Sequence, residues 1–372
     1  MTKKDIPVIE LAGTDYEIGF RHGSLLKDMI QDFYHTSFDL HRNNLSLLSD
    51  RKALLDFTGK NTGFLKKYSM PLYEELQGIA DGSGLALEDL VYLNSFLELE
   101  DLRPPGLGSR LLSKSLWGCT SFNILPEAAK DRKPYVGQTF DMEQYYSKYN
   151  VVLKIRPDNG PVQLVYSLAG ILGLNGMNSA GIALTINKVV ANDARSGVIY
   201  PFIVRRALAQ ERIGDAFGAV VFTERASGIN YQLSCREGVA WCIETSAGSY
   251  DLLPVKGAIS HTNHYLSPLM RKFETANWLS HGGSYVRHQV STGMLEKKMG
   301  EIDVDLLKQL TRDHTNYPRC ICAHGLEEQG EMDAFATIAA VVYDTADLVM
   351  HICNENPCLN EYVQIKLETV GK

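Results

Sequence analysis

The chain has 372 residues, of which 45% are hydrophobic and 22% are charged, as expected for a globular protein with a sizeable core. The net charge of −7 and the lack of a long basic run argue against a nucleic-acid-binding protein. No stretch approaches about 18 uninterrupted apolar residues, so we expect no membrane span.

The N-terminal stretch MTKKDIPVIELAGTDYE lacks the apolar region of a secretory signal. The chain has seven cysteines, an odd number that favours reduced thiols over a disulfide framework. Together these features predict a cytoplasmic protein. They leave open whether it forms a homo-oligomer.

Apolar residues at helical spacing predict that the first hundred residues are mostly helical. A helix begins at the cap signal Thr14-Asp15, and others are expected near 50–66, 70–82 and 87–97. Residues 101–115 concentrate Pro, Gly and Ser, which indicates an exposed connector.

From Cys119 onward, short alternating or apolar segments predict strands. These segments are 119–125, 134–142, 150–157, 162–170, 181–189, 230–244, 256–266, 335–344 and 347–355, with helical blocks at 200–222 and 284–313. Strands in groups and helices in groups indicate an α+β layered fold rather than a doubly wound sheet. The chain has no glycine-rich phosphate loop.

The first two strands are predicted to form a hairpin. The turn-like segment LPEAAKDRKP between them is centred near Lys130. Folding about that centre places Cys119 opposite Asp141, which brings a thiol and a carboxylate side by side.

The Gly118-Cys119 junction suggests a specific chemistry. A glycine does not cover its own carbonyl, so the next thiol can attack it and exchange the amide for a thioester that water hydrolyses. The new chain begins at Cys119 and carries a free α-amine, whose reference pKa of about 7.7–8.0 suits a general base. Such a nucleophile needs no catalytic histidine. The competing interpretation is a buried cysteine that only packs.

Four motifs in this order carry a resemblance: GCTSF, GQTFD (137–141), GMNSAGIAL (176–184) and SHTNHYLSP (260–268). With the opening AGTDYEIGFRHG and the late RDHTNYP and ENPC, they resemble the penicillin acyltransferase family of N-terminal nucleophile hydrolases. That family includes isopenicillin N acyltransferase and β-alanyl-dopamine hydrolase. The resemblance implies a four-layer αββα sandwich and no cofactor.

Carried over by position, the resemblance implies that Cys119 is both the cleavage point, after Gly118, and the nucleophile. Asp141 would hold the freed α-amine, and Asn263 would supply the side-chain half of the oxyanion hole. Further candidates near the site are Asn178 for the second oxyanion donor, Gln138 as a supporting partner, and Thr120. Asp141 and Asn178 are alternatively ordinary strand-end and turn residues.

The family commonly reads Ser-Ile-Cys-Arg-His where this chain has Cys320-Ile-Cys322-Ala323-His324. Arg319 could substitute for the missing arginine. Retention of the fold without catalysis, as a small-molecule-binding protein, is the alternative that Ala323 supports. A third alternative is a metal-dependent hydrolase using these residues or His261 and His264, but the C-x-C and H-x-x-H spacings do not fit a zinc site. We therefore expect no metal.

The resulting prediction divides the chain into a mainly helical pro-segment (1–118) and a catalytic chain (119–372) that remain associated as one compact unit. The predicted reaction is acyl transfer from the amide of a small N-acyl compound to water or an amine.

Overall fold

The computed structural model describes residues 5–44, 51–101, 118–275, 278–325 and 334–367. The connector predicted at 101–115 lies outside the described residues, apart from Asp101, which ends a helix. Seven helices of the described part of the chain precede Gly118: α1 (Asp15–Leu25), α2 (Lys27–Asn44), α3 (Arg51–Gly59), α4 (Thr62–Tyr68), α5 (Met70–Ser83), α6 (Leu87–Asn94) and α7 (Phe96–Asp101). The predicted start of the first helix is confirmed, because Thr14 and Glu17 form a capping box there.

The strands form two sheets. The eight-stranded sheet has the order β1 (Val8–Gly13), β4 (Asn150–Pro157), β5 (Gln163–Leu168), β6 (Asn175–Asn178), β7 (Ile182–Lys188), β8 (Ile229–Cys235), β9 (Ala240–Thr245), β10 (Tyr250–Leu253). The six-stranded sheet has the order β11 (Ala258–His261), β2 (Gly118–Ile124), β3 (Tyr135–Glu143), β12 (Phe335–Asp344), β13 (Val349–Asn354), β14 (Val363–Lys366).

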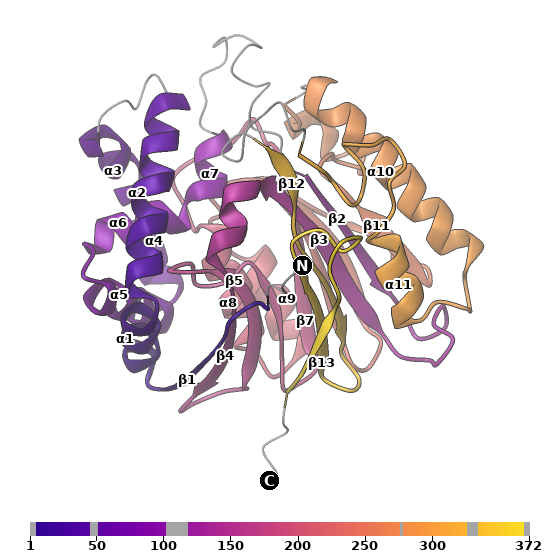
Figure 1. Ribbon diagram of the computed structural model, residues 1–372, viewed down its shortest axis with the longest axis horizontal. Coiled ribbons are helices and arrows are strands. Elements are labelled where there is room, and N and C mark those ends of the chain that lie inside the picture. Colours follow the sequence, from indigo (N-terminus) through magenta and orange to yellow (C-terminus); the bar gives the residue numbers. More distant parts are fainter. Residues whose placement is uncertain (1–4, 45–50, 102–117, 276–277, 326–333, 368–372) are drawn as a thin grey trace.

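The two sheets pack face to face, since β2 and β3 of one contact β7 and β8 of the other. Helices α8 (Tyr200–Leu208) and α9 (Ile213–Val221) cover the outer face of the eight-stranded sheet. Helices α10 (Trp278–Lys297) and α11 (Val304–Leu310) cover the outer face of the six-stranded sheet (Figure 1). The predicted four-layer αββα sandwich is confirmed. Short 3₁₀ helices η1 (Gln144–Tyr149) and η2 (Arg271–Phe273) complete the elements.

The described part of the first hundred residues is mostly helical, as predicted, with one strand in addition: Val8–Gly13 form β1, paired in parallel with β4. The predicted helical block at 284–313 is two helices, α10 and α11, because the chain turns at Gly300 with φ +82°.

The hairpin of β2 and β3 forms as predicted, but its register differs by one residue. Ile124 pairs with Tyr135, so the centre of the hairpin lies between residues 129 and 130 and not at Lys130. Cys119 therefore pairs with Phe140, and Gly118 pairs with Asp141. Because side chains alternate along a strand, this shift places the Cys119 and Asp141 side chains on opposite faces of the sheet.

Candidate active site

Cys119 lies near the start of β2 and faces the space between the two sheets. Ser121, two residues further on and on the same face, donates a 2.5 Å hydrogen bond to Asn187 of β7. Cys119 is 2% exposed. Burial and the nearby charge of Asp141 raise its pKa to about 12, although Arg287 and main-chain hydrogen bonds at Asp141 and Lys188 act in the opposite direction. In the intact chain the thiol is therefore protonated at neutral pH.

Asp141 lies on the other face of β3, beside the residue that precedes Cys119. A Cβ placed on Gly118 would lie 2.7 Å from Asp141 Oδ2 and 3.0 Å from the ring of Phe335, so only glycine fits without displacing a neighbour. The Thr337 hydroxyl donates to Asp141 Oδ1 at 2.7 Å. Oδ2 is buried and has no hydrogen-bond partner among the residues that the structure describes.

Burial raises the pKa of Asp141 to about 6, while the charge of Arg287 and the hydroxyls of Thr337 and Thr139 act to lower it. The carboxyl group therefore changes its protonation state close to neutral pH, at a position directly beside the Gly118-Cys119 link.

Asn263 contacts the main chain of Cys119 directly. Its Oδ1 accepts a 2.9 Å hydrogen bond from the Cys119 amide, and its Nδ2 donates to the Lys188 carbonyl at 3.0 Å. The side chain thus connects the start of β2 to the end of β7. The motif residues Cys119, Asp141 and Asn263, far apart in sequence, surround one peptide unit.

Arg287 of α10 belongs to this group and was not predicted. Its Nη1 donates to the Cys119 carbonyl at 2.6 Å and to Thr120 Oγ1 at 3.1 Å, and its Nη2 donates to Asn263 Oδ1 at 2.8 Å. Arg287 is 5% exposed, and burial lowers its pKa while the charge of Asp141 acts to raise it. It is the cationic group whose charge acts on both Cys119 and Asp141.

A pattern in the sequence could have indicated Arg287. Ser284, Arg287 and Ser291 recur at helical spacing, which places three polar side chains on one face of α10. Ser284 accepts a hydrogen bond from the Asn263 amide, and Ser291 donates one to Ser260 of β11. A polar stripe on a covered helix face indicates that the helix holds polar groups of a neighbouring element.

The two supporting candidates lie next to the group. Thr120 is buried on the α10 side of β2, where Arg287 contacts it. Gln138 lies on the inner face and accepts a 2.8 Å hydrogen bond from the Ile186 amide, which ties β3 to β7 of the opposite sheet. Gln138 pairs with Ser121 and so lies one inward-facing position from Cys119.

Asn178 does not join this group, contrary to the prediction. Its Oδ1 accepts from the amides of Ala180 and Ile182, and its Nδ2 donates to the carbonyls of Leu208 and Gln210. It thus organises the turn that begins β7, whereas Asn263 contacts the other end of β7, at Lys188. These contacts fit the alternative interpretation, in which Asn178 is a turn residue.

Arg319 is exposed and also lies outside the group. Its main chain lies close to Gly283, one turn of α10 before Arg287. The neighbouring Ala323 reaches the site through its backbone instead: its amide donates to Thr337 Oγ1 at 2.8 Å, and Thr337 in turn contacts Asp141. The guanidinium at this site is therefore that of Arg287.

The two histidines of the HTNH motif have separate partners. His261 Nε2 lies 2.8 Å from Glu244 Oε1, with both side chains fully buried. His264 Nδ1 lies 2.8 Å from the Ser284 hydroxyl, and its ring stacks on Tyr285. They therefore brace the loop that carries Asn263 and do not form a joint metal site.

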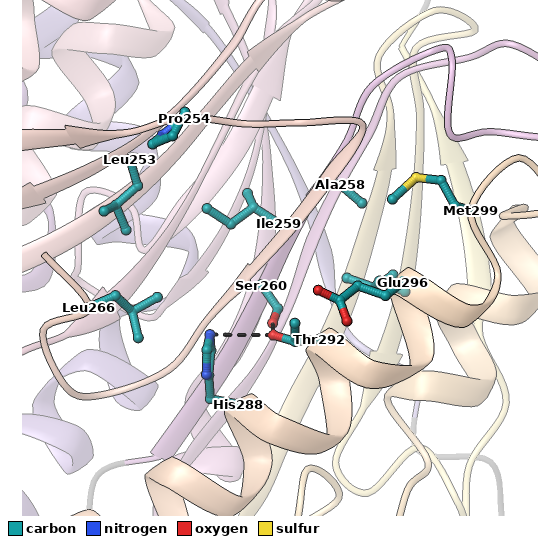
Figure 2. Close-up of a pocket in the computed structure, with 11 residues that line it drawn as sticks. Leu253, Pro254, Ala258, Ile259, Ser260, Leu266, His288, Thr292, Glu296 and Met299 are labelled. Carbon is teal, nitrogen blue, oxygen red and sulfur yellow. Dashed lines mark hydrogen bonds between the residues drawn. The ribbon is translucent and has the colours of Figure 1, made fainter.

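A cavity of about 290 Å³ lies between β11, the segment after β10 and α10 (Figure 2). His288 and Thr292 face each other in it at 3.3 Å. None of its lining residues is a predicted site residue. This cavity is therefore distinct from the group around Cys119.

Among the described residues, no helix is long and apolar enough to cross a membrane.

Comparison with known proteins identifies the class. Residues 128–358 match the family described as acyl-coenzyme A:6-aminopenicillanic acid acyl-transferase, and because this match covers more than half of the chain, the protein belongs to that family. The predicted family is thereby confirmed.

Two relatives align over most of their length. The acyl-coenzyme A:6-aminopenicillanic-acid-acyltransferase 40 kDa form of Emericella nidulans is 26% identical over 83% of this chain and 82% of its own. The β-alanyl-dopamine/carcinine hydrolase of Drosophila melanogaster is 24% identical over 96% of this chain and 95% of its own. A solved Caenorhabditis elegans N-acylethanolamine-hydrolyzing acid amidase ortholog is 14% identical, with a TM-score of 0.43 over 61% of this chain and 93% of that chain.

Proposed function

We propose that the protein is a cysteine amidohydrolase or acyltransferase that activates itself by cleaving the Gly118-Cys119 bond. The observation that carries the proposal is the arrangement around this one peptide unit. Asn263 and Arg287 hold the main chain of Cys119, and a buried carboxyl group lies against Gly118. A cysteine that only packed in the core would need none of these polar groups, which are costly to bury.

In the cleavage step, Cys119 Sγ attacks the Gly118 carbonyl carbon, and the thiol proton passes to the departing Cys119 nitrogen. Water then hydrolyses the thioester, which leaves a carboxylate on Gly118 and regenerates the thiol. In the intact chain, Asn263 Oδ1 accepts a hydrogen bond from the Cys119 amide, and after cleavage the new α-amine takes the place of that amide. Asp141 Oδ2, unpartnered among the described residues, offers this amine a second contact once the bond to Gly118 is open.

In turnover, the α-amine takes the thiol proton as Sγ attacks the acyl carbon of the substrate, and later returns a proton to the leaving amine. Asn263 Nδ2, which now donates to the Lys188 carbonyl, supplies a donor for the negative charge that develops on the acyl oxygen. Water or an amine then takes the acyl group from Sγ. All of these steps use the chain's own groups.

The substrate class is a small compound with an N-acyl or amide bond. Support comes from the family and from the two relatives, which are named as an acyltransferase and as a hydrolase of a β-alanyl compound. Hydrolysis and transfer differ only in the nucleophile that resolves the acyl-enzyme. Both therefore follow from the same site.

The test compares Cys119→Ala with Cys235→Ser, a control at a buried cysteine of β8 outside the group. β-Alanyl amides, N-acyl amino acids and acyl-CoA with amine acceptors form the assay panel, with amine release or capture as the readout. We expect turnover by the wild type and the control, loss of turnover in Cys119→Ala, and loss after iodoacetamide treatment. Unchanged activity in Cys119→Ala would refute the mechanism. Ligand binding without turnover by a chain whose 118–119 bond stays intact would instead support a binding protein.

A further inference from the structure

A second group of reactive side chains lies outside the candidate active site. His314, Cys322, His324 and Cys358 each offer one ligand atom, and these four atoms all lie within 4.8 Å of one another. The Sγ atoms of Cys322 and Cys358 are 3.4 Å apart, and His324 Nε2 lies 3.6 Å from the first and 3.4 Å from the second. His314 Nε2 lies 3.1 Å from His324 Nε2.

Four of the six separations between these ligand atoms are close to the edges of a tetrahedral zinc site, and the other two, from His314 to the two sulfurs, are at most 4.8 Å. With Zn–S bonds of about 2.3 Å and Zn–N bonds of about 2.0–2.1 Å, neighbouring ligand atoms lie about 3.3–3.8 Å apart. The four edges given above fall within a few tenths of an ångström of this range. A hydrogen bond between two histidines would explain one of these edges, but not the approach of two thiols to the same imidazole nitrogen of His324.

These four residues were not identified as a group from the sequence, because only the short C-x-C and H-x-x-H spacings were considered. Cys320 and Cys322 looked like a pair, but Cys320 Sγ contacts the Cys322 carbonyl at 2.9 Å and is not one of the four. The residues grouped with Cys322 are instead His324, His314, which lies eight residues before Cys322, and Cys358, which follows β13. We propose that His314, Cys322, His324 and Cys358 form a structural Zn²⁺ site of the Cys₂His₂ type.

The surroundings of the four residues suit this role. Asn356 Nδ2 lies 3.6 Å from Cys322 Sγ and donates to the Ala323 carbonyl at 2.6 Å, so an amide orients both a thiolate ligand and its neighbour. Cys322 is buried, His324 and Cys358 are half-buried, and His314 is exposed, which leaves an entry path for the ion. Four protein ligands fill a tetrahedral ion, as in structural rather than catalytic zinc sites.

The site would also support the active-site group. Two of its ligands, Cys322 and His324, flank Ala323, whose amide holds Thr337, and Thr337 holds Asp141. A bound ion would tie the loop around residues 314–324 to the turn after β13. Its contribution is to stability and to the position of Asp141, and none of the chemical steps passes through it.

The test measures metal content, which does not depend on activity. Protein purified without chelator is analysed by elemental analysis, alongside His314→Ala, Cys358→Ser and the control Cys235→Ser. His314 is exposed, so its replacement leaves the core packing in place. We expect about one zinc per chain in the wild type and the control, and a loss of most of it in the other two. Removal of zinc from the wild type should lower its melting temperature, and reconstitution with Co²⁺ should give tetrahedral ligand-field and thiolate charge-transfer bands.

The proposal is overturned if wild-type protein purified with added zinc retains none, or if Cys358→Ser retains as much as the control. A Cys322–Cys358 disulfide found by peptide mapping of freshly purified protein would overturn it too, because oxidised sulfurs do not ligate zinc. Failure of the cleavage mechanism at Cys119 would leave these measurements unaffected.

Discussion

At the scale of residues, the proposed chemistry depends on the link between Gly118 and Cys119. The close approach of Asp141 Oδ2 explains why residue 118 lacks a side chain, and the contacts of Asn263 and Arg287 hold the main chain of Cys119. The thiol itself is buried, and its pKa is raised to about 12. The proposed cleavage would supply what the intact chain lacks, which is a base next to the thiol.

Arg287 gives the sharpest prediction at the scale of residues. Arg287→Met leaves the Cys119 carbonyl and Asn263 Oδ1 without their charged donor and removes the positive charge that acts on Asp141. We expect the rate of chain cleavage to fall by about 10²–10³-fold. We also expect the free energy of unfolding to fall by about 3 kcal/mol or more.

The measurements are the fraction of cleaved chain over time and urea unfolding, with Arg212→Met as the control. Arg212 is exposed and pairs with Asp215, so its loss should change stability by less than about 1 kcal/mol. Because a structural defect alone could slow cleavage, the pH dependence of the cleavage rate is recorded as well. An unchanged rate in Arg287→Met would remove Arg287 from the mechanism.

The sequence predicted Cys119, Asp141 and Asn263 because short motifs mark them, and the structure brings them around one peptide unit. It did not predict Arg287: the polar spacing of Ser284, Arg287 and Ser291 marks a polar face of α10, but the residues which that face contacts depend on where α10 docks. The assumed turn centre at Lys130 was wrong by half a residue, which was enough to reverse the face of Asp141 relative to the thiol.

At the scale of elements, the strands that the sequence missed are short: β1, β10 and β14 at the sheet edges, and the inner strand β6. In β1 only Leu11 is buried, so the strand lacks the run of apolar residues that would distinguish it from a loop. β10 and β14 likewise bury few side chains. The other inner strands were predictable because strong apolar or alternating runs coincide with turn residues at their ends. β2 differs from the other inner strands in its polar content. It is buried along its whole length, and its Ser121 and Asn123 form hydrogen bonds to the opposite sheet.

Helix α1 offers a pH-dependent prediction. His22 is fully buried, its Nε2 accepts from the Gly170 amide at 3.1 Å, and burial together with the charge of Arg205 lowers its pKa to about 3. As pH falls, His22 therefore takes up a proton in the unfolded chain before it does so in the folded chain. The stability that neutral His22 provides is present above about pH 6.5 and is lost as pH falls from there toward about 3.

We expect the unfolding free energy of wild type to fall more steeply between pH 6 and pH 4 than that of His22→Gln, by up to about 1.4 kcal/mol per pH unit. Urea unfolding across this range measures both slopes. His35→Gln, at an exposed histidine of α2, controls for the loss of an imidazole. Parallel slopes for wild type and His22→Gln would contradict the assigned protonation state.

At the scale of the whole molecule, the segments on either side of residue 118 share one core. β1 forms an edge of the eight-stranded sheet, and Glu75 of α5 makes two hydrogen bonds, of 2.7 and 2.8 Å, to Arg205 of α8 inside the protein. Asn94 of α6 bonds to the Gly170 carbonyl in the same region. Cutting the chain at residue 118 breaks none of these contacts.

We therefore predict that the two chains stay together after cleavage. Both should elute in one peak on gel filtration and separate only under denaturing conditions. Glu75→Gln, which leaves Arg205 buried without its carboxylate, should weaken the association. Separation of the wild-type chains in native buffer would contradict a shared core.

The central claim is that Cys119 becomes the N-terminus of a chain, and intact mass with N-terminal sequencing tests it most directly. We predict that purified wild type consists of residues 1–118 and 119–372, the second beginning Cys-Thr-Ser, and that Cys119→Ala remains one chain. A wild-type protein that turns over N-acyl substrates while its 118–119 bond stays intact would contradict the account.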